Sequence, residues 1–450
     1  MDAIAAWHAL LRPDVELTPA FSLAFADAMR ARKLTFGSRV HCRVLRPFFL
    51  QAEDEQRIRL ASETIAGVGE RIAAAAVDDP ELRAALGLTE EEERLVLMDP
   101  GYTTASTASR LDAFLLPDAL HFAEYNAESP AGPAYTERLC ELFEGLDVMA
   151  QFRAVRNVRF HRTIPPLLSA LLESYGEWGG RAAPPRIAIV DWREVPTWTE
   201  FELLAEAFVS AGVPTVVSDP RDLTFERGTL RAGGAAVDLV YRRVLVNDVI
   251  ARKEDCNALL QAYEQRAVCV ANTFRCKMPH KKALFAILTD PAHAHRLDAG
   301  EHAVVRAHVP WTRAVADVAA EHQGRQGSLL EIARTGRRAL VLKPNDEYGG
   351  AGVHLGWETS AADWDSALDR ALRDARGSWV VQERIPVRRE VFPAFDDEGR
   401  VTMTDMLVDL APYLFRGRMQ GYLTRLSATG LANVTSGGGQ VPAFVVENRR

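Results

Sequence analysis

The first 93 residues carry apolar side chains three and four positions apart, in runs rich in Ala, Leu, Glu and Arg. That spacing places the apolar residues on one helix face, and these residue types favour helix formation. The pattern predicts helices over 21–32, 56–77 and 80–86. We therefore expect residues 1–93 to form a helical N-terminal region that serves as scaffold or cap.

A second unit is expected over 94–180. Its predicted elements are a strand in the short apolar run 94–98, a strand at 121–126, where polar and apolar residues alternate, and a helix at 134–146. Between the last two, Ser129-Pro-Ala-Gly-Pro133 is a turn signal. Small residues, Gly and Pro over 176–185 indicate a domain boundary.

The pattern then changes to alternating strands and helices. Strands are predicted at 186–190, 214–217, 237–241 and 268–271, with helices at 199–212 and 253–265. Such alternation is typical of parallel sheets and predicts a small parallel α/β domain over 186–271. The rest of the chain, 272–450, carries predicted strands at 338–343 and 378–385 around a helix at 363–374. The fold class is therefore α/β (α+β).

Composition narrows the functional classes. The chain has 53 Lys and Arg against 61 Asp and Glu, a net charge of −8, which argues against nucleic-acid or anionic-membrane partners but leaves room for a local basic pocket. The sequence lacks the run of about 18 apolar residues that a transmembrane helix needs. Asp2 stands where an export signal is basic, so a cytoplasmic location is expected. The five scattered cysteines indicate reduced thiols, and Cys269 and Cys276 lack zinc-site spacing.

The strongest chemical signal follows the strand that ends at Lys343. Three glycines, Gly349, Gly350 and Gly352, come within four residues in the loop that follows. Glycine lets backbone N–H groups approach phosphate oxygens, and Lys343 adds a positive charge. The segment matches neither a P-loop nor a dinucleotide-binding fingerprint. Phosphate binding and a plain hairpin or loop are the two interpretations.

A candidate metal pair lies on the predicted strand 121–126. Glu124 and Asn126 are two positions apart, so their side chains point to the same face of a strand. Carboxylate and amide oxygens are suitable Mg²⁺ ligands, and Glu347 offers a third oxygen. The alternative is an ordinary solvated strand face.

Three weaker signals complete the set. Arg425 leads into a glycine-rich loop that ends at Gly437–Gly439, which is either a lid over substrate or a flexible surface loop. The strand 379–385 either contacts an adenine edge or is only a strand. Lys281 and Lys282 open a predicted helix after Pro279, where a phosphate partner would offset their charge.

In this order the motifs resemble the circularly permuted ATP-grasp enzymes, most closely the eukaryotic-type glutathione synthetase. The resemblance covers about residues 94 to 450 and rests on Glu124-x-Asn126, Val240-Tyr-Arg-Arg243, Lys281, Lys343-Pro-Asn-Asp-Glu-Tyr-Gly-Gly350, Gln382-Glu-Arg-Ile385, and Arg425 with Gly437–Gly439. It implies an ATP-grasp fold in circularly permuted order, in which 186–271 is the substrate-binding domain, 94–180 carries the metal-binding strand, and 272–450 binds the nucleotide.

The resemblance also implies residue roles. The implied catalytic residues are Arg425, Lys343 and Gly438, and the implied metal ligands are Glu124, Asn126 and Glu347. The implied nucleotide-binding residues are Lys281, Lys343, Asn345, Gly349, Gly350, Gln382, Glu383, Ile385 and Asp409. The implied substrate-binding residues are Arg110, Ser129, Arg243, Arg425, Gly437, Gly438 and Gly439.

The function implied is an ATP-dependent, Mg²⁺-requiring carboxylate–amine ligase that acts through an acyl phosphate on an amino acid, peptide or polyamine. A phosphotransferase of the same fold and a non-catalytic nucleotide-binding protein are the alternatives. Ser427 stands where the family usually has Lys, so glutathione synthesis itself is not inferred. Arg242 is an additional arginine, either for a second carboxylate or for a surface salt bridge. Related enzymes are often homodimers, although the sequence leaves the oligomeric state open.

Overall fold

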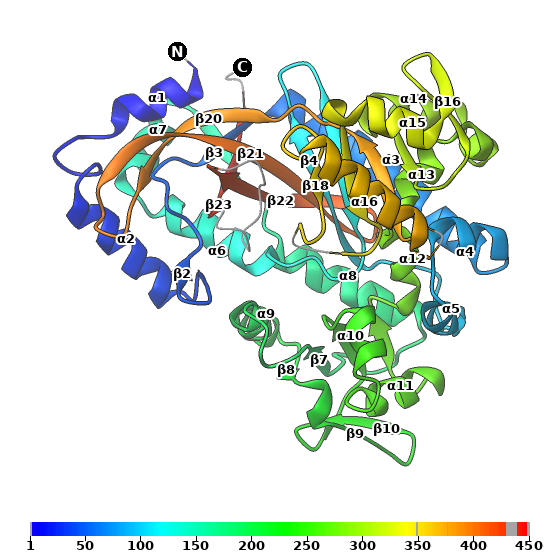
Figure 1. Cartoon of the computed structure of the whole chain (residues 1–450). Coiled ribbons are helices and arrows are strands. Elements are labelled where there is room, and N and C mark those ends of the chain that lie inside the picture. Colours follow the sequence, from blue (N-terminus) through cyan, green and yellow to red (C-terminus); the bar gives the residue numbers. More distant parts are fainter. Residues whose placement is uncertain (1, 348–349, 376, 429–438, 448–450) are drawn as a thin grey trace.

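A computed structural model describes residues 2–347, 350–375, 377–428 and 439–447. Its largest sheet has the strand order β23-β22-β21-β4-β5, with β20 paired to β21. The strands are β4 (Ala108–Leu115), β5 (Leu120–Asn126), β20 (Arg388–Phe395), β21 (Val401–Phe415), β22 (Arg418–Ser427) and β23 (Gly439–Val441). Because β21 pairs antiparallel with β4, segments from both halves of the chain share one sheet (Figure 1).

The N-terminal region is mainly helical, as predicted. Its helices are α1 (Ala3–Leu10), α2 (Pro19–Ala31), α3 (Ala52–Ala76), α4 (Pro80–Leu86) and α5 (Glu90–Leu97), and its short strands are β1 (Thr35–Phe36), β2 (Arg39–Val40) and β3 (Phe48–Gln51). β3 pairs with β24 (Ala443–Glu447), which also pairs with β6 (Asn157–Arg159). Backbone hydrogen bonds therefore join the last described strand to the N-terminal region.

The strand predicted at 94–98 is wrong, because this segment belongs to α5 and the residue after it. Thr89 Oγ1 accepts a hydrogen bond from the Glu92 amide, and the Glu92 carboxylate accepts one from the Thr89 amide. This capping box starts a helix four residues before the apolar run. Leu95 and Val96 are then buried as one face of that helix.

The predicted parallel strands are present in a four-stranded sheet of order β13-β12-β7-β8. Its strands are β7 (Ile187–Val190), β8 (Thr215–Ser218), β12 (Leu239–Arg242) and β13 (Cys269–Ala271), accompanied by β9 (Leu223–Glu226), β10 (Thr229–Ala232) and β11 (Ala235–Ala236) in a separate small sheet. The neighbouring helices are α8 (Ile164–Glu177), α9 (Trp198–Ser210), α10 (Val246–Ala251) and α11 (Asn257–Glu264). Every residue of β7 is buried, as expected of a strand covered on both faces.

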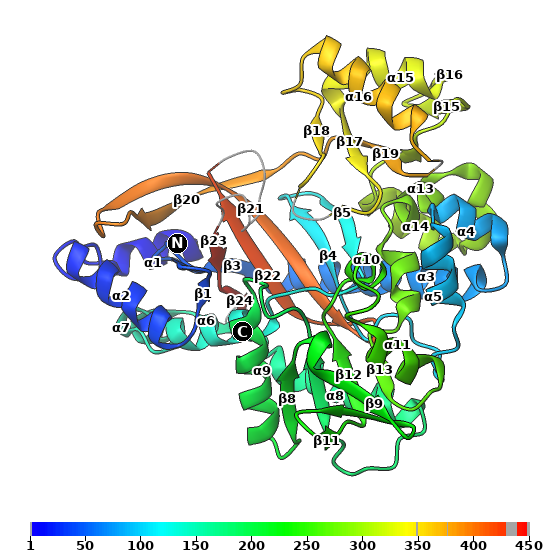
Figure 2. The ribbon, with the colours of Figure 1, turned by 60° about the horizontal axis from the view of Figure 1, so that its bottom comes forward.

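A second four-stranded sheet, of order β14-β19-β17-β18, lies beside the β4–β5 end of the large sheet (Figure 2). Its strands are β14 (Thr312–Ala314), β17 (Leu340–Pro344), β18 (His354–Leu355) and β19 (Trp379–Glu383). Leu340, Leu342 and Val381 pack from one face against a core around Trp364 of α16 (Ala361–Arg373). The opposite face, with Lys343 and Gln382, is left for the site described below.

The remaining elements connect these units. They are α6 (Pro133–Glu144), α7 (Asp147–Val155), α12 (Lys277–His280), α13 (Ala283–Thr289), α14 (Ala299–His308), β15 (Ala319–His322), β16 (Arg325–Ser328), α15 (Leu329–Thr335) and α16 (Ala361–Arg373). Among the described residues, none of the helices has the length and hydropathy to cross a membrane.

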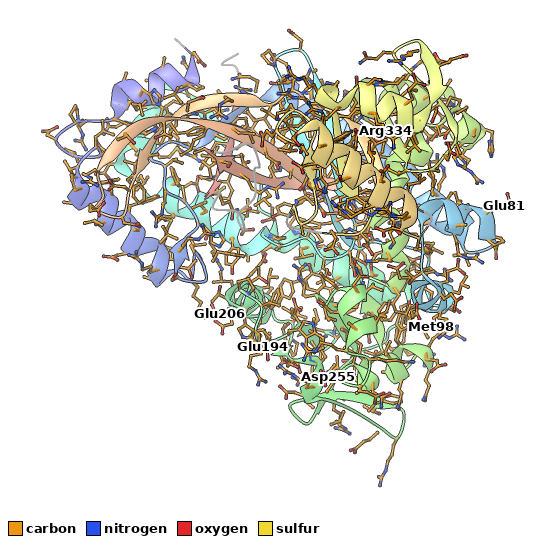
Figure 3. The ribbon with its side chains drawn as sticks, in the orientation of Figure 1. Glu81, Met98, Glu194, Glu206, Asp255 and Arg334 are labelled. Carbon is orange, nitrogen blue, oxygen red and sulfur yellow. The ribbon has the colours of Figure 1, made fainter. Side chains whose placement is uncertain are left out.

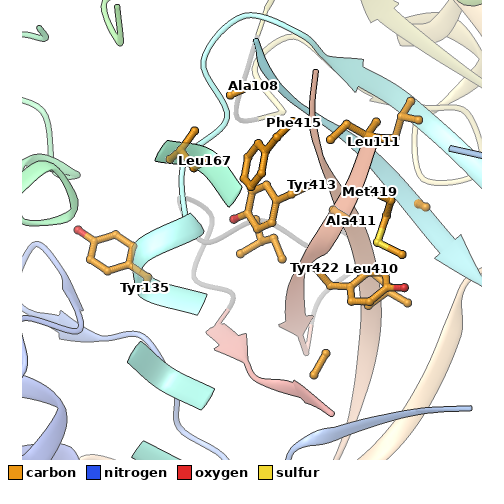
Figure 4. Packing of buried hydrophobic residues seen from close by; sticks show 14 of the residues in the cluster. Ala108, Leu111, Tyr135, Leu167, Leu410, Ala411, Tyr413, Phe415, Met419 and Tyr422 are labelled. Carbon is orange, nitrogen blue, oxygen red and sulfur yellow. The ribbon is translucent and has the colours of Figure 1, made fainter. Parts of the chain in front are cut away.

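The largest apolar core surrounds the central strands. In Figure 4, Tyr413 and Phe415 of β21 lie toward Leu167 of α8, whereas Leu410 lies on the other side of the strand. Charged side chains such as Glu81, Glu206 and Arg334 stand at the periphery (Figure 3). The polar residues of the candidate site are the exception to this division.

Asn272 connects the parallel sheet to the large sheet. Its fully buried side chain follows β13; its Oδ1 accepts from the Ala108 amide at 2.8 Å, and its Nδ2 donates to the Ala108 carbonyl at 2.7 Å. The same Nδ2 lies 3.0 Å from the Ala127 carbonyl and 2.6 Å from the Glu128 carbonyl. One side chain therefore satisfies backbone groups at the start of β4 and just after β5.

We expect Asn272→Ala to lower the free energy of unfolding by about 3 to 5 kcal/mol, because it leaves several buried backbone polar groups without this hydrogen-bond partner. Urea denaturation measures the change. Asn257→Ala is the matched control, since the Asn257 side chain makes an exposed hydrogen bond to Gln261 and its loss should change stability by less than about 1 kcal/mol. Equal effects of the two substitutions would contradict the role of Asn272.

Candidate active site

The predicted metal pair lies on the face of β5 turned away from the core. Tyr125 is buried, while Glu124 and Asn126 on either side of it are partly exposed. Asn126 Nδ2 donates to Glu124 Oε1 at 3.2 Å, so the two side chains converge. Their oxygen atoms suit a hard cation such as Mg²⁺. Burial would raise the pKa of Glu124, but the ammonium groups of Lys282 and Lys343 and the hydrogen bond from Asn126 together lower it below its usual value.

The pairing of β4 with β5 extends this polar face. Asp112 lies opposite Glu124, and Arg110 lies opposite Asn126. Arg110 Nε donates to Asp112 Oδ1 at 2.8 Å. The predicted substrate arginine therefore lies directly beside the predicted metal pair, as register alone requires.

Arg425 on β22 joins Asp112 of β4 to Asp409 of β21. Its Nη2 donates to Asp112 Oδ2 at 2.6 Å and also to Asp409 Oδ2. Burial would raise the pKa of Asp112, but Arg110 and Arg425 together lower it below its usual value. Burial raises the pKa of Asp409 to about 7, and Arg425 only partly opposes that rise. Among the residues that the structure describes, Arg425 Nε and Asp409 Oδ1 are buried without a hydrogen-bond partner.

Two lysines face the metal pair from the opposite side. Lys343 Nζ donates to Gln382 Oε1 at 2.7 Å and to the Ala123 carbonyl at 3.3 Å. Lys282 Nζ lies 3.5 Å from Glu124 Oε2 and donates to the Glu347 carbonyl at 2.7 Å. The Glu347 side chain is exposed. Lys282 thus links the two segments that carry the predicted metal ligands.

Lys281, rather than Lys282, was the predicted phosphate ligand. Its ammonium donates to Glu92 Oε1 and to Asp346 Oδ2, both at 2.7 Å, and its side chain is 3% exposed. Lys281 therefore belongs to a buried ion-pair cluster, while its neighbour faces Glu124. The dipeptide Lys281-Lys282 was the only sequence signal, and it could not tell which lysine faces the site.

Asn345, another predicted nucleotide ligand, is engaged by the backbone. Its Oδ1 accepts from the Ala283 amide at 2.8 Å, and its Nδ2 donates to the carbonyls of Leu86 and Gly377 at 2.8 and 2.7 Å. The side chain is buried, so these contacts anchor the loop after β17.

The predicted substrate residues Arg110, Ser129 and Arg243 meet at the loop 129–132. Arg243 Nη1 donates to the Pro130 carbonyl at 2.8 Å, and Arg110 Nη1 donates to the Ala131 carbonyl at 3.1 Å. Ser129 Oγ donates to the Arg242 carbonyl at 3.4 Å. The structure therefore brings these three residues around one loop.

Glu200, which the sequence analysis did not select, holds the same loop. Its Oε1 accepts from the Gly132 amide at 2.7 Å, while its Oε2 is buried and has no hydrogen-bond partner in the described part of the chain. Its position in a helix of mixed polarity offered no sequence signal.

The surface salt bridge considered for Arg242 is wrong, because this side chain is fully buried. It donates to the Val244 carbonyl at 2.5 Å, contacts Glu128 at 3.4 Å, and stacks on the Phe274 ring at 5.1 Å. Arg242 thus fastens the end of β12 to the segment after β5.

A cavity of about 740 Å³ adjoins the end of β19. Glu383 and Ile385 line it together with Trp311 and His121, the last of which precedes Glu124 by three residues on β5. At about 3.3 Å per residue, the cavity and the metal pair lie roughly 10 Å apart along that strand. The predicted adenine-contacting segment therefore borders a space of ligand size.

Parts of the predicted glycine-rich loops lie outside the described residues, namely Gly349, Gly437 and Gly438. Gly350 is described and has φ +78°, a conformation that favours glycine. Gly439 begins β23 and pairs with Leu426 of β22, so the described end of the predicted lid adjoins the strand of Arg425.

Comparison with known proteins supports the fold assignment. A glutathione synthetase-like effector from Globodera pallida, solved in its apoform, has a TM-score of 0.61 and 13% sequence identity over 97% of this chain and 98% of that chain. A putative gamma-glutamylcysteine synthetase from Methylobacillus flagellatus KT has a TM-score of 0.40 and 9% identity over 81% of this chain and 83% of that chain. No family model and no curated protein sequence matches the chain.

The first similarity confirms the predicted resemblance in fold: the chain has a mixed α/β, glutathione synthetase-like fold. The circularly permuted order of its elements, the domain boundaries and the residue roles stay predictions.

Lys343 provides a test of the electrostatics. Burial lowers its pKa from 10.5 to about 8. At pH 7 the amine is charged in both the folded and the unfolded protein, so only the folded state bears the burial cost. Between the two pKa values the folded state loses its proton first, and the free energy of unfolding therefore rises with pH.

We expect Lys343→Met to raise the free energy of unfolding at pH 7 by about 1 to 3 kcal/mol, because it removes a buried charge. The gain should vanish by about pH 10.5, where both states of the wild type are neutral. Urea denaturation across this pH range measures the difference. Lys253→Met, at an exposed lysine, should show no such dependence; a pH-independent effect at position 343 would contradict the lowered pKa.

Proposed function

We propose that the protein is an ATP-dependent ligase that joins a small-molecule carboxylate to an amine. The observation that carries this proposal is the arrangement on β4 and β5. There the oxygen ligands Glu124 and Asn126 face the ammonium groups of Lys282 and Lys343, with Arg110 opposite Asn126. Positive groups around a hard-cation site are what a reaction between two anions requires, because ATP and a carboxylate repel each other.

The nucleotide half of the proposal rests on the cavity beside β19. Its volume of about 740 Å³ suits a nucleoside, and Glu383 and Ile385 line it. Its distance from Glu124 is comparable to the reach from an adenine to a terminal phosphate. Lys343 and Lys282 would then lie beside the phosphates.

The donor set near Glu124 fits Mg²⁺, since carboxylate and amide oxygens converge there. Glu124 and Asn126 would hold the ion, with Glu347 in the loop that follows the strand of Lys343. The bound ion would neutralise phosphate charge. The protein's own groups do the rest. Lys343 and Lys282 orient the phosphates, and Arg110 and Arg425 orient the carboxylate that attacks.

In the proposed reaction, a substrate carboxylate oxygen attacks the γ-phosphorus of ATP, and the bond to the β–γ bridging oxygen breaks to release ADP. An amine then attacks the acyl carbon of the acyl phosphate. Phosphate leaves with the bonding electrons, and the amine proton passes to solvent or phosphate. Arg425 serves here by holding negative charge on the carboxylate side.

The experiment is ADP release measured across pooled amino acids, small peptides and polyamines, with hydroxylamine added as a surrogate amine. Formation of an acyl hydroxamate only when a carboxylic acid substrate is present supports the ligase proposal. A stable phosphorylated product without any amine indicates the phosphotransferase, and ATP binding without turnover indicates the non-catalytic protein. Either result contradicts the ligase proposal.

Substitutions of the two adjacent lysines should have different effects on activity and stability. Lys282→Met removes the ammonium near Glu124 and should lower kcat/KM for ATP by about a hundredfold with little change in the melting temperature. Lys281→Met should instead lower the melting temperature, because it removes one of the ammonium groups that neutralise Glu92 and Asp346. ADP release and thermal denaturation of both variants measure this. The reverse pattern would place Lys281 at the phosphates.

A further inference from the structure

A buried ion-pair cluster holds the loop between Lys343 and Glu347. Asp346, in this loop, places Oδ1 2.7 Å from Lys277 Nζ and Oδ2 2.7 Å from Lys281 Nζ. The side chains of Lys277 and Lys281 are 1% and 3% exposed. A carboxylate that bridges two buried ammonium groups cannot leave them without removing one counter-charge from each in a low dielectric.

The same lysines reach two other segments. Lys281 contacts Glu92 of α5 at 2.7 Å, and Lys277 contacts Glu128 at 3.3 Å. Glu128 lies two residues beyond Asn126, which is the last residue of β5. The cluster therefore connects the segment just after the strand of Glu124 with the loop that carries Glu347.

The backbone reinforces this connection at the neighbouring residue. The amide of Lys282 donates to the Asn345 carbonyl at 3.1 Å, and the amide of Ala283 donates to Asn345 Oδ1 at 2.8 Å. The loop after β17 is thus tied to the α12–α13 junction at Asn345 and Asp346, next to the lysine that faces Glu124.

We propose that Asp346 is a positioning residue, which through Lys277 and Lys281 sets the distance between the Glu347 loop and the Glu124–Asn126 strand. This inference rests on the proposed function, since it assigns Asp346 a role in aligning the Mg²⁺·ATP site. Asp346 itself touches no reacting atom. Its effect is to keep Lys343, Glu347 and Lys282 in register with Glu124, because three buried charges must move together or not at all.

A purely stabilising cluster would produce the same fold, so the test needs a readout that stability alone does not change. Asp346→Ala leaves two lysines underpaired and lowers stability in either case. The double variant Asp346→Ala/Lys277→Met removes one charge of each sign and restores the balance. The melting temperature should then recover whether Asp346 positions the loop or only stabilises the fold. If Asp346 positions the loop, its connection to the lysines stays broken and Mg²⁺·ATP affinity stays low.

Mg²⁺·ATP binding to the full chain, measured by isothermal titration calorimetry, is the readout. We expect Asp346→Ala to weaken binding about tenfold to a hundredfold, as outer residues of metal sites do. The double variant should regain the melting temperature but not the affinity. In a Glu347→Gln background, the Asp346 substitution should cause less than about a threefold further loss, because the group it positions is already altered.

Asp219→Ala is the matched control. Asp219 is a fully buried carboxylate that pairs with Arg221 at 2.6 Å in the parallel-sheet region. Its loss should lower the melting temperature and leave Mg²⁺·ATP affinity within about twofold. The control therefore reports how much affinity a comparable loss of stability removes.

The outcomes separate this inference from the proposed function. If the wild type fails to bind Mg²⁺·ATP, both are overturned. If the wild type binds it and the double variant binds it equally well, Asp346 has only a structural role and the inference alone is overturned. Weak binding in the double variant, with a recovered melting temperature and an unaffected Asp219 control, supports the positioning role.

Discussion

A charge taken out of water must have a partner, and this constraint organises the centre of the molecule. Arg110, Asp112, Arg425 and Asp409 pair across three strands of the large sheet, and Lys277, Lys281 and Asp346 pair beside them. Breaking a buried pair is far more costly than breaking one on the surface. Elements that contribute to these clusters are therefore held in fixed relative positions.

The candidate site lies beside the ion pair between Arg110 and Asp112. The face of β4 and β5 carries Glu124, Asn126 and Arg110, and the sheet that contains Lys343 lies beside it (Figure 2). Buried ion pairs supply rigidity, while Lys343 keeps a charge whose burial is unfavourable. A charged group that is present although its burial lowers the stability of the protein is a common sign of a functional role.

In this arrangement, residues next to each other in the sequence have different roles. Lys281 is enclosed with Glu92 and Asp346, whereas Lys282 faces Glu124. Arg242 and Arg243 also differ in their contacts, since the first donates to the Val244 carbonyl and the second donates to the Pro130 carbonyl in the loop 129–132. A change of one position in the register would exchange these roles.

The sequence alone predicted the helices at 80–86 and 363–374, the parallel strands and the placement of Glu124 and Asn126 on one strand face, because each depends on local periodicity. It misassigned 94–98, where a capping box outside the apolar run decides the structure. Only the tertiary structure decided which lysine faces Glu124, that Arg242 is buried, and that Glu200 and Asp346 belong near the site. These depend on contacts between segments far apart in the chain, such as Lys281 with Glu92, and no local pattern encodes such distances.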